Sequence, residues 1–416
     1  MEQECLRDEH VPKSYTRGTH RTRKPDETLA RAKRVSARAG VTRIADVTGL
    51  DIIGLPVVAV YRPNARSLSV SQGKGLDLTA AMTSGVMEAI ESYHAEHVQL
   101  PLRLASHVEL SARARVVDVQ RLPRLVTSML RLERPTLWVE GVELMAATSI
   151  WVPYEMVHTN YTLPLPTGSG MFMMSSNGLA SGNHLLEAIS HGMCEIVERD
   201  AVALWSLRGG VSRRDCRIDP ASIEDPDCRR VLELLDAAEV AYGVWDATSD
   251  VGLAAFVCVI VDREHNDFRP LYYATGSGCH AAREIALLRA ITEAAQCRLT
   301  YICGARDDAG RDFFERARDP ERVQSMRSFV VAESAPSRRF ADVPSAVHAS
   351  CEADVAWQLD CLRRAGISEV AAVDLTLPEF EIPVVRVVIP GLESLHDAPG
   401  YVPGARARAV REERAS

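Results

Sequence analysis

The sequence predicts an α+β fold. Its helical and strand-like segments follow one another without a regular strand–helix–strand alternation. A hydrophobic content of 46% and an aromatic content of 6% allow an ordinary buried core. A length of 416 residues is long for one compact domain and leaves room for two or three subdomains.

The first half of the chain begins with a polar, charged segment, and helical and strand-like segments follow it. Residues 1–27 predict an extended arm, and residues 28–39 a helix. Strands are expected at Leu55–Tyr61 and Ser67–Ser71, because Arg62-Pro63-Asn64 between them is typical of a hairpin. The remaining segments of this half are a helix over 78–97, strand-like residues 134–158, a loop over Tyr161–Met174 and a helix over 184–208.

The second half predicts one further long helix and two groups of strands. A helix over 227–238 precedes strands at 241–246, 254–262 and 270–276, and a helix over 281–303 follows them. Residues 306–350 are charged and predict loops. The chain then predicts a helix near 351–366 and strands near 369–374 and 383–389.

Three of the expected helices carry acidic side chains at helical spacing. In the helix over 184–208, four polar residues fall within one arc of about 80°, namely Glu187, His191, Glu195 and Glu198. An acidic stripe of this kind is commonly the solvated face of a surface helix. Glu88 and Glu91 in the first helix, and Glu293 with Gln296 in the third, repeat the pattern. If the three helices meet, they form a pocket suited to divalent metal, because clustered carboxylates repel one another without a cation.

Glycine-rich segments precede two of these helices. Ser175–Asn183 runs into the second acidic helix, with Asn183 as a candidate N-cap. Gln72-Gly73-Lys74-Gly75 precedes the first acidic helix. Such loops can leave backbone N–H groups free for an anion, and a helix N-terminus favours negative charge. The combination predicts bound phosphate together with magnesium.

The order of these motifs resembles the YcaO family. The motifs are Gly73-Lys74-Gly75, Ser84-x-x-x-Glu88-x-x-Glu91, Ser176-Asn177-Gly178 with Gly182-Asn183, Glu187 with Glu195-x-x-Glu198-Arg199, and Glu293-x-x-Gln296-x-Arg298. A closer resemblance, to the TfuA-associated branch, rests on Gly18-Thr19-His20-Arg21, Arg62-Pro63-Asn64 and Glu91-Ser92-Tyr93-His94-Ala95-Glu96. The resemblance implies a domain of mixed β-sheets with helices around a multi-magnesium ATP site. It divides the chain into an arm at 1–27, a core at 28–305 and a looser C-terminal part of the same domain at 306–416.

The resemblance also implies an activity, ATP- and Mg²⁺-dependent activation of a peptide backbone amide. A nucleophile adds to the amide carbon, the oxygen takes the γ-phosphoryl group of ATP, and phosphate then leaves. A neighbouring Cys, Ser or Thr side chain gives an azoline, whereas an external sulfide equivalent gives a thioamide. The TfuA-associated branch favours the thioamide, with TfuA, a precursor peptide and a sulfide source or sulfur-carrier protein as partners. An azoline-forming cyclodehydratase and a non-catalytic ATP-binding accessory protein are the alternatives.

The family motifs assign a role to individual residues. Metal-facing positions are Glu88, Glu91, Glu187, Glu195, Glu198 and Gln296, and nucleotide-binding positions are Lys74, Ser84, Asn183, Arg199 and Arg298. Catalysis falls to Glu195, Glu198 and Arg199. Four of these positions also have a structural alternative: Gln296 as a solvent-facing side chain, Arg199 in an ion pair, and Ser84 and Asn183 as helix caps. For His191 the structural role is the favoured one.

Composition excludes several other classes of protein. A net charge of −8 and a pI near 5.9 argue against nucleic acid as the main partner. No apolar run has membrane-spanning length, and no secretion signal is recognisable. Ten cysteines without a C-x-x-C pair suit a reduced, cytoplasmic protein. The chain lacks the Pro-x-Pro-x-Pro ending of many azoline-forming relatives, and we expect a homodimer that recognises the leader peptide through another protein.

Overall fold

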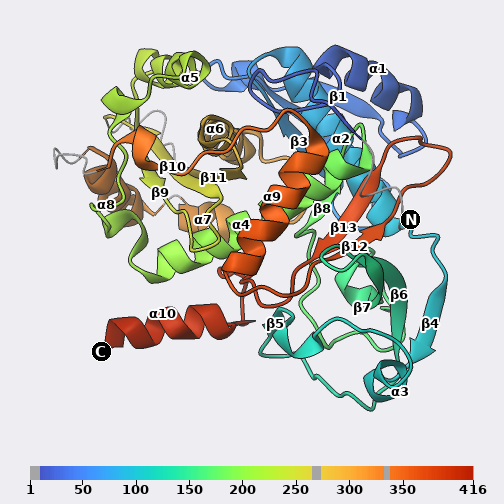
Figure 1. The fold of residues 1–416 in the computed structure, drawn as a ribbon. Coiled ribbons are helices and arrows are strands. Elements are labelled where there is room, and N and C mark those ends of the chain that lie inside the picture. Colours follow the sequence, from blue (N-terminus) through green and yellow to red (C-terminus); the bar gives the residue numbers. More distant parts are fainter. Residues whose placement is uncertain (1–9, 265–272, 318, 332–337, 416) are drawn as a thin grey trace.

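Three long helices lie at the centre of the molecule and are flanked by three antiparallel sheets (Figure 1). The computed structural model describes residues 10–264, 273–317, 319–331 and 338–415. The central helices are α2 (Leu78–Glu96), α4 (Leu185–Leu207) and α6 (Arg283–Cys303). They correspond to the three acidic helices of the sequence, and each begins and ends within two residues of its predicted bounds. The predicted α+β class is therefore confirmed.

The N-terminal sheet packs against α2. Helix α1 (Pro25–Ser36) precedes strands β1 (Arg43–Asp46), β2 (Val57–Tyr61) and β3 (Val70–Lys74), which pair in the order β1-β2-β3. The predicted hairpin is confirmed, but its second strand lies three residues later than expected. Arg62 at the hairpin turn is buried, where it pairs with Glu96 and donates to the Ala39 carbonyl at 2.8 Å. Since Glu96 also accepts from the Ser67 amide at 3.0 Å, the turn is fixed to the end of α2.

Gly73 lies in strand β3, not in the predicted phosphate loop. A Cβ atom at this position would stand 2.0 Å from the Ala81 carbonyl oxygen of α2. The residue is glycine because β3 and α2 approach this closely. The close approach places Lys74, the next residue, beside the central helices.

A second sheet covers one side of α6. Its strands pair in the order β11-β10-β9, with β9 at Val240–Asp246, β10 at Ala254–Asp262 and β11 at Ala274–His280. All nine side chains of β10 are buried, as its continuous apolar run predicts. The sequence predicts the third strand at 270–276. Residues 270–272 lie outside the described residues, and β11 ends at His280, four residues after the predicted end. Helix α5 (Pro226–Ala237) packs against α6 and β9.

The third sheet joins segments from distant parts of the chain. Its strands run in the order β4-β6-β12-β13-β8. A sixth strand, β7, lies off this path and pairs with β6. Their bounds are β4 Leu102–Ala105, β6 Thr136–Glu143, β7 Thr148–Pro153, β8 Leu179–Ser181, β12 Ala371–Asp374 and β13 Val384–Val388. Helix α4 packs on β8 and β13, so the C-terminal third of the chain helps to position the second acidic helix.

The C-terminal part contains helices that the sequence did not predict. Residues 306–350, expected to be loops, include α7 (Arg311–Ala317) and α8 (Pro320–Val331). The expectation was wrong because α8 buries only Val323 and Val330 and shows little amphipathic pattern. The expected helix near 351–366 is α9 (Cys351–Arg364), and the Arg-rich end forms α10 (Ala405–Ala415). The short elements are α3 His107–Ser111, β5 Arg124–Leu125 and β14 Tyr401–Val402.

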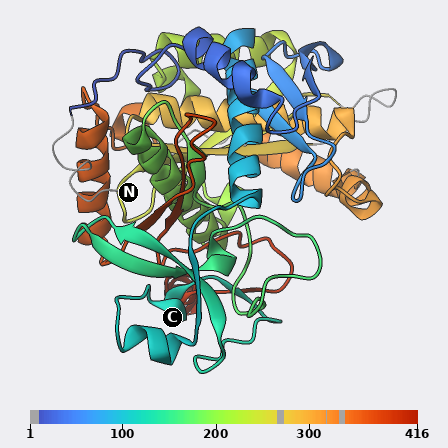
Figure 2. The same ribbon diagram turned by 90° about the vertical axis from the view of Figure 1, so that its right-hand side faces the viewer.

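The N-terminal arm has no helix over residues 10–24, but α1 begins at Pro25, so the helix predicted at 28–39 lies three residues earlier than expected. The arm runs between α9 and α1 across one end of the molecule (Figure 2). Pro12 forms a bridge with Ser350, and the Lys13 amide donates to the Ala349 carbonyl at 3.0 Å. The arm is thus held by contacts to the C-terminal part of the chain.

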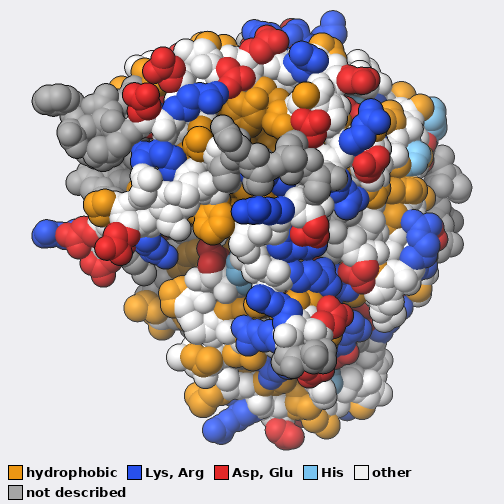
Figure 3. Space-filling model, turned by 90° about the vertical axis from the view of Figure 1, so that its left-hand side faces the viewer, with side chains coloured by type: hydrophobic (Ala, Val, Ile, Leu, Met, Phe, Trp, Pro, Cys, Tyr) orange, Lys and Arg blue, Asp and Glu red, His pale blue; other side chains and the backbone are white. Residues whose placement is uncertain are grey.

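The surface charge is uneven. On the face shown in Figure 3, Lys and Arg side chains form a band that Asp and Glu interrupt, although the net charge of the chain is −8. Among the described helices, none is long and apolar enough to cross a membrane. The nine cysteines in the described residues carry free thiols.

Candidate functional site

Acidic and basic side chains from the three central helices and β3 converge on one site. Helix α2 contributes Glu88 and Glu91, and α4 contributes Glu195, Glu198 and Arg199. The α4 residues share a face because positions three and four apart are neighbours on a helix. Electrostatic interactions couple Glu88 to Glu195, and Glu91 to both. The structure therefore brings together four of the five predicted metal-facing glutamates.

Two of these carboxylates are held by strands that end at the site. Glu198 accepts hydrogen bonds from the Ser277 hydroxyl at 2.7 Å and the Cys279 amide at 2.9 Å, both in β11. Glu91 accepts from the amide and hydroxyl of Ser181 in β8, at 2.9 and 2.6 Å. These bonds fix the orientation of the acidic groups before any ligand binds.

Helix α6, the third central helix, adds the carboxylate of Glu293, which pairs with Lys74. Glu293 of α6 contacts the Lys74 ammonium at 2.6 Å. Burial by itself raises the pKa of Glu293, but Lys74 and Arg199 outweigh burial and leave the pKa below its usual value. Gln296, one turn later, donates through its amide nitrogen to the Gln72 carbonyl of β3 at 3.2 Å. Gln296 is half-buried and bound to protein through its amide nitrogen, and its role as a metal ligand stays a prediction.

Burial disfavours the charged form of three other carboxylates, those of Glu88, Glu91 and Glu195. Burial raises the pKa of Glu91 to about 8, and burial also raises the pKa of Glu195 against the opposing charge of Arg199. Glu88 reaches solvent, yet the protein around it desolvates it enough to raise its pKa, with Lys74 opposing. A cation is the missing partner that would favour the charged forms.

Arg199 stands among three of the acids. Burial would lower its pKa, but Glu198, Glu293 and Glu195 outweigh burial and raise the pKa above its ordinary value. Its Nε atom is buried and has no hydrogen-bond partner among the described residues. A charged guanidinium with a spare donor suits the binding of phosphate. The ion-pair alternative for Arg199 and the phosphate-binding prediction are thus compatible.

The donor set fits magnesium together with a polyphosphate. Within the described residues, no three His, Cys, Asp or Glu side chains are close enough to hold a metal ion by themselves. Mg²⁺ prefers six oxygen ligands and in proteins is commonly held by one or two carboxylates, with substrate phosphates and water completing the shell. Glu88, Glu91, Glu195 and Glu198 would supply the carboxylates, and Lys74 and Arg199 would neutralise phosphate.

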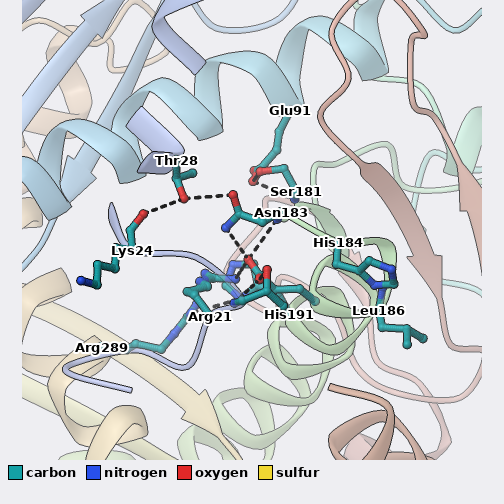
Figure 4. A network of polar contacts seen from close by, with 12 residues as sticks. Arg21, Lys24, Thr28, Glu91, Ser181, Asn183, His184, Leu186, His191 and Arg289 are labelled. Carbon is teal, nitrogen blue, oxygen red and sulfur yellow. Dashed lines mark hydrogen bonds and ion pairs between the residues drawn. The ribbon is translucent and has the colours of Figure 1, made fainter. Parts of the chain in front are cut away.

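Glu187 of α4 is bound to the N-terminal arm, and Figure 4 labels two of its partners, Arg21 and Asn183. It accepts from the Thr22 amide at 2.9 Å and the Thr22 hydroxyl at 3.0 Å, and it pairs with Arg21 at 3.3 Å. Asn183 donates to the same carboxylate through its amide N–H at 3.1 Å, and accepts from Thr28 at 2.9 Å. The metal-binding role of Glu187 and the nucleotide role of Asn183 stay predictions.

Two local expectations around α4 are wrong. The N-cap is His184, whose ring accepts from the Leu186 amide, and not Asn183. The segment Ser175–Asn183 does not present a row of free amides either, because the amides of Ser181, Gly182 and Asn183 donate to Glu91, Pro383 and Glu187. In α2 the N-cap is Asp77, and Ser84 lies inside the helix one turn before Glu88, so the cap alternative for Ser84 is wrong as well.

Arg298 makes its ion pairs with two aspartates that are not members of the carboxylate cluster. It is 1% exposed and donates to Asp51 at 2.8 and 3.2 Å and to Asp262 at 2.8 Å. These contacts give Arg298 a structural partner on each side of its guanidinium, and its nucleotide role stays a prediction.

Sequence reasoning did not assign a role to Arg289 or Glu293. Arg289 of α6 donates to His191 at 3.1 Å and interacts electrostatically with Glu195 and Glu293. The sequence does contain a signal for Arg289, because it precedes Glu293 by one turn on the same helix and so shares its face. His191 is consequently a partner of Arg289, in agreement with the structural role favoured for it.

Comparison with known proteins identifies the family. A family model described as YcaO cyclodehydratase, ATP- and Mg²⁺-binding, matches residues 72–393. The chain belongs to the YcaO family. That description agrees with the predicted cofactors, ATP and Mg²⁺.

Relatives of this YcaO protein include two uncharacterised proteins. One, from Rhizobium leguminosarum bv. trifolii, is described as lying in the tfuA 3′ region; it is 36% identical over 89% of this chain and 87% of its own length. Another, from Methanothermobacter thermautotrophicus, is 34% identical over 93% of this chain and 98% of its own.

Solved structures establish the same fold. YcaO from Methanopyrus kandleri, bound with AMPPCP and Mg²⁺, superposes with a TM-score of 0.71 at 21% identity over 94% of this chain and 98% of the other. A heterocyclase in complex with substrate and cofactor gives a TM-score of 0.75 at 23% identity. It covers 93% of this chain, which spans about half (54%) of the heterocyclase.

Binding of Mg²⁺ with ATP is expected to release protons near pH 7. With the pKa of Glu91 at about 8, that carboxyl is protonated in much of the metal-free protein, and a divalent cation favours the deprotonated form. Apparent Mg²⁺ affinity should therefore rise with pH up to about 8. Titration calorimetry in two buffers of different ionisation enthalpy measures the release, and Glu91→Gln should reduce it. Equal heats in both buffers would contradict the prediction.

Proposed function

We propose that this YcaO protein is an ATP- and Mg²⁺-dependent thioamide synthetase that acts on a backbone amide of a ribosomally synthesised precursor peptide together with TfuA. One observation carries the choice of thioamide: the relative in the tfuA 3′ region is 36% identical across 89% of this chain. The converging carboxylates and cations supply a site suited to the chemistry.

The residues of the site would bind and orient the reactants. Glu88, Glu91, Glu195 and Glu198 would hold the metal, and Lys74 and Arg199 would neutralise phosphate. When bound, Mg-ATP supplies the phosphoryl group that turns the amide oxygen into a leaving group. Because positioning and charge stabilisation dominate phosphoryl transfer, side chains fixed in advance are the protein's main contribution. The bonds from Ser277, Cys279 and Ser181 supply that fixation.

The overall reaction balances with hydrosulfide as the sulfur source. Amide, ATP and HS⁻ give thioamide, ADP and hydrogen phosphate: the carbon–oxygen bond breaks, a carbon–sulfur bond forms, and phosphate carries away the amide oxygen. Cys297 and Cys303, the two cysteines closest together in the sequence, are poorly suited to carry sulfur. Burial raises the pKa of Cys297 to about 11 and also raises the pKa of Cys303, which disfavours reactive thiolates. Sulfur would therefore arrive from outside, from TfuA, a sulfide source or a sulfur-carrier protein.

The azoline alternative is favoured by a different observation. The matching family model is named for cyclodehydratases, and a heterocyclase shares the fold. A cyclodehydratase needs no external sulfur, because the nucleophile is a side chain of the peptide itself.

Mass spectrometry of the peptide separates the two functions. Purified protein, precursor peptide, ATP and Mg²⁺ are incubated with and without TfuA and sulfide. We expect replacement of oxygen by sulfur only when sulfide and TfuA are present, and little or no change without them. Loss of water with neither addition would overturn the proposal in favour of the cyclodehydratase. A thioamide formed from sulfide alone would remove only the requirement for TfuA.

A further inference from the structure

A small cavity lies beside the carboxylate cluster, between the N-terminal arm and helices α4, α6 and α9. Its volume is about 20 Å³, enough for one solute of the size of a water molecule. Among its lining residues are His20, His191, His280, Arg21, Arg289 and Cys351. Arg289 also interacts with Glu195 and Glu293, so the cavity adjoins the candidate active site.

Three histidines that line this space carry hydrogen-bond donors. The Nδ1 atom of His191 accepts from Arg289 at 3.1 Å, that of His280 from the Ala282 amide at 3.0 Å, and that of His20 from Lys13 at 3.3 Å. An Nδ1 that accepts is unprotonated, so each neutral ring carries its hydrogen on Nε2. No Nε2 atom of the three has a protein partner among the described residues. Burial, the first cause in each case, lowers the pKa of all three rings, to about 4 for His20, which keeps them neutral.

The acceptors around the cavity are already occupied. Glu187 receives hydrogen bonds from Thr22, Asn183 and Arg21 (Figure 4). Asp354 pairs with Lys13 at 2.5 Å and His348 at 3.0 Å. The two cations that line the cavity, Arg21 and Arg289, thus balance its two carboxylates in charge, and the Nε atom of Arg289 is buried without a hydrogen-bond partner among the described residues.

We propose that this cavity binds hydrosulfide and holds it next to the site of amide activation. Donors without acceptors, the buried Nε–H of Arg289 among them, favour an anion. Cys194 and Cys351 give the cavity a soft, polarisable wall that suits sulfur better than oxygen. The choice of hydrosulfide among small monoanions rests on the proposed thioamide synthesis, which requires this co-substrate.

Equilibrium dialysis with ³⁵S-labelled sodium hydrosulfide, under anaerobic conditions and without ATP or peptide, tests the site. Wild-type protein should bind one equivalent. Cys351→Leu fills the cavity from α9 and should abolish binding, whereas Cys351→Ala leaves the space open and should retain it. His280→Phe removes one donor and should weaken binding by about tenfold or more, and His280→Gln, which restores an N–H, should recover it. Circular dichroism of each variant verifies that it is folded.

Two results would overturn the proposal. Equal binding by wild-type protein and folded Cys351→Leu would place the hydrosulfide elsewhere. Complete displacement by an equal concentration of chloride would make the cavity a general anion site. The dialysis measures binding without turnover, so its result can be interpreted separately from the proposed function. If the protein forms azolines without sulfide, thioamide synthesis is refuted, but the binding of hydrosulfide is still measured.

Discussion

Replacing Glu195 or Glu198 by Gln is expected to lower ATP turnover by about a thousandfold, to the limit of detection. Each substitution removes a full negative charge from the predicted metal-facing cluster while keeping the shape of the side chain. Losing a fixed electrostatic contact at the reacting centre commonly costs 10²–10³ in rate, and a displaced metal adds to that loss. Phosphate release with peptide, sulfide and TfuA present is the measurement.

The fold should survive both substitutions. At position 198 a Gln carbonyl can still accept from the Cys279 amide, and its NH₂ can donate to the Ser277 hydroxyl, which is able to accept. At position 195 burial already favours the uncharged carboxyl, so a neutral amide costs little. Thermal unfolding verifies this, and Glu224→Gln, at an exposed position, is the matched control. Near-normal ATPase in either variant would refute the metal assignment.

The central helices could be predicted because their sequences carry two signals at once. In α4 the apolar side chains Ile189, Met193 and Val197 are buried and the acids lie on another face, so the helical period is visible from either set. Strand β3 was displaced in the prediction because Gly73 and Lys74 look like a loop. Glycine at this position reflects the close approach of α2, which no local pattern records. Helices α7 and α8 were missed because charged segments with few buried residues lack periodicity.

The part of the site that lies on one face of α4 could be predicted from the sequence. Glu195, Glu198 and Arg199 are neighbours by helix geometry alone, and the structure places them together. Glu187 shares their arc in projection, yet it lies two turns earlier and meets Thr22 and Arg21 of the arm. A helical projection omits the rise along the axis, so it cannot separate these two environments. Partners such as Ser277, from a strand about 80 residues later in the chain, depend on tertiary packing.

Arg298→Met is expected to destabilise the protein by about 3–5 kcal/mol, the cost of removing one member of a buried ion-pair network. Asp51 and Asp262 have 3% and 9% of their side-chain surface exposed, and both lose the cation they share. Chemical denaturation measures the loss. An unchanged free energy of unfolding would refute the structural role.

A compensated variant separates stability from nucleotide binding at Arg298. When Asp51→Asn and Asp262→Asn accompany Arg298→Met, no buried charge of this trio remains, and most of the lost stability should return, because a neutral replacement of a buried ion-pair network is often tolerated. ATP affinity is then measured on a folded protein. If Arg298 acts only through Asp51 and Asp262, as its contacts indicate, affinity should match the wild type. A tenfold or greater loss of affinity in this stable variant would instead assign Arg298 to the nucleotide, as its position in the YcaO motif implies, since its structural contribution would already have been replaced.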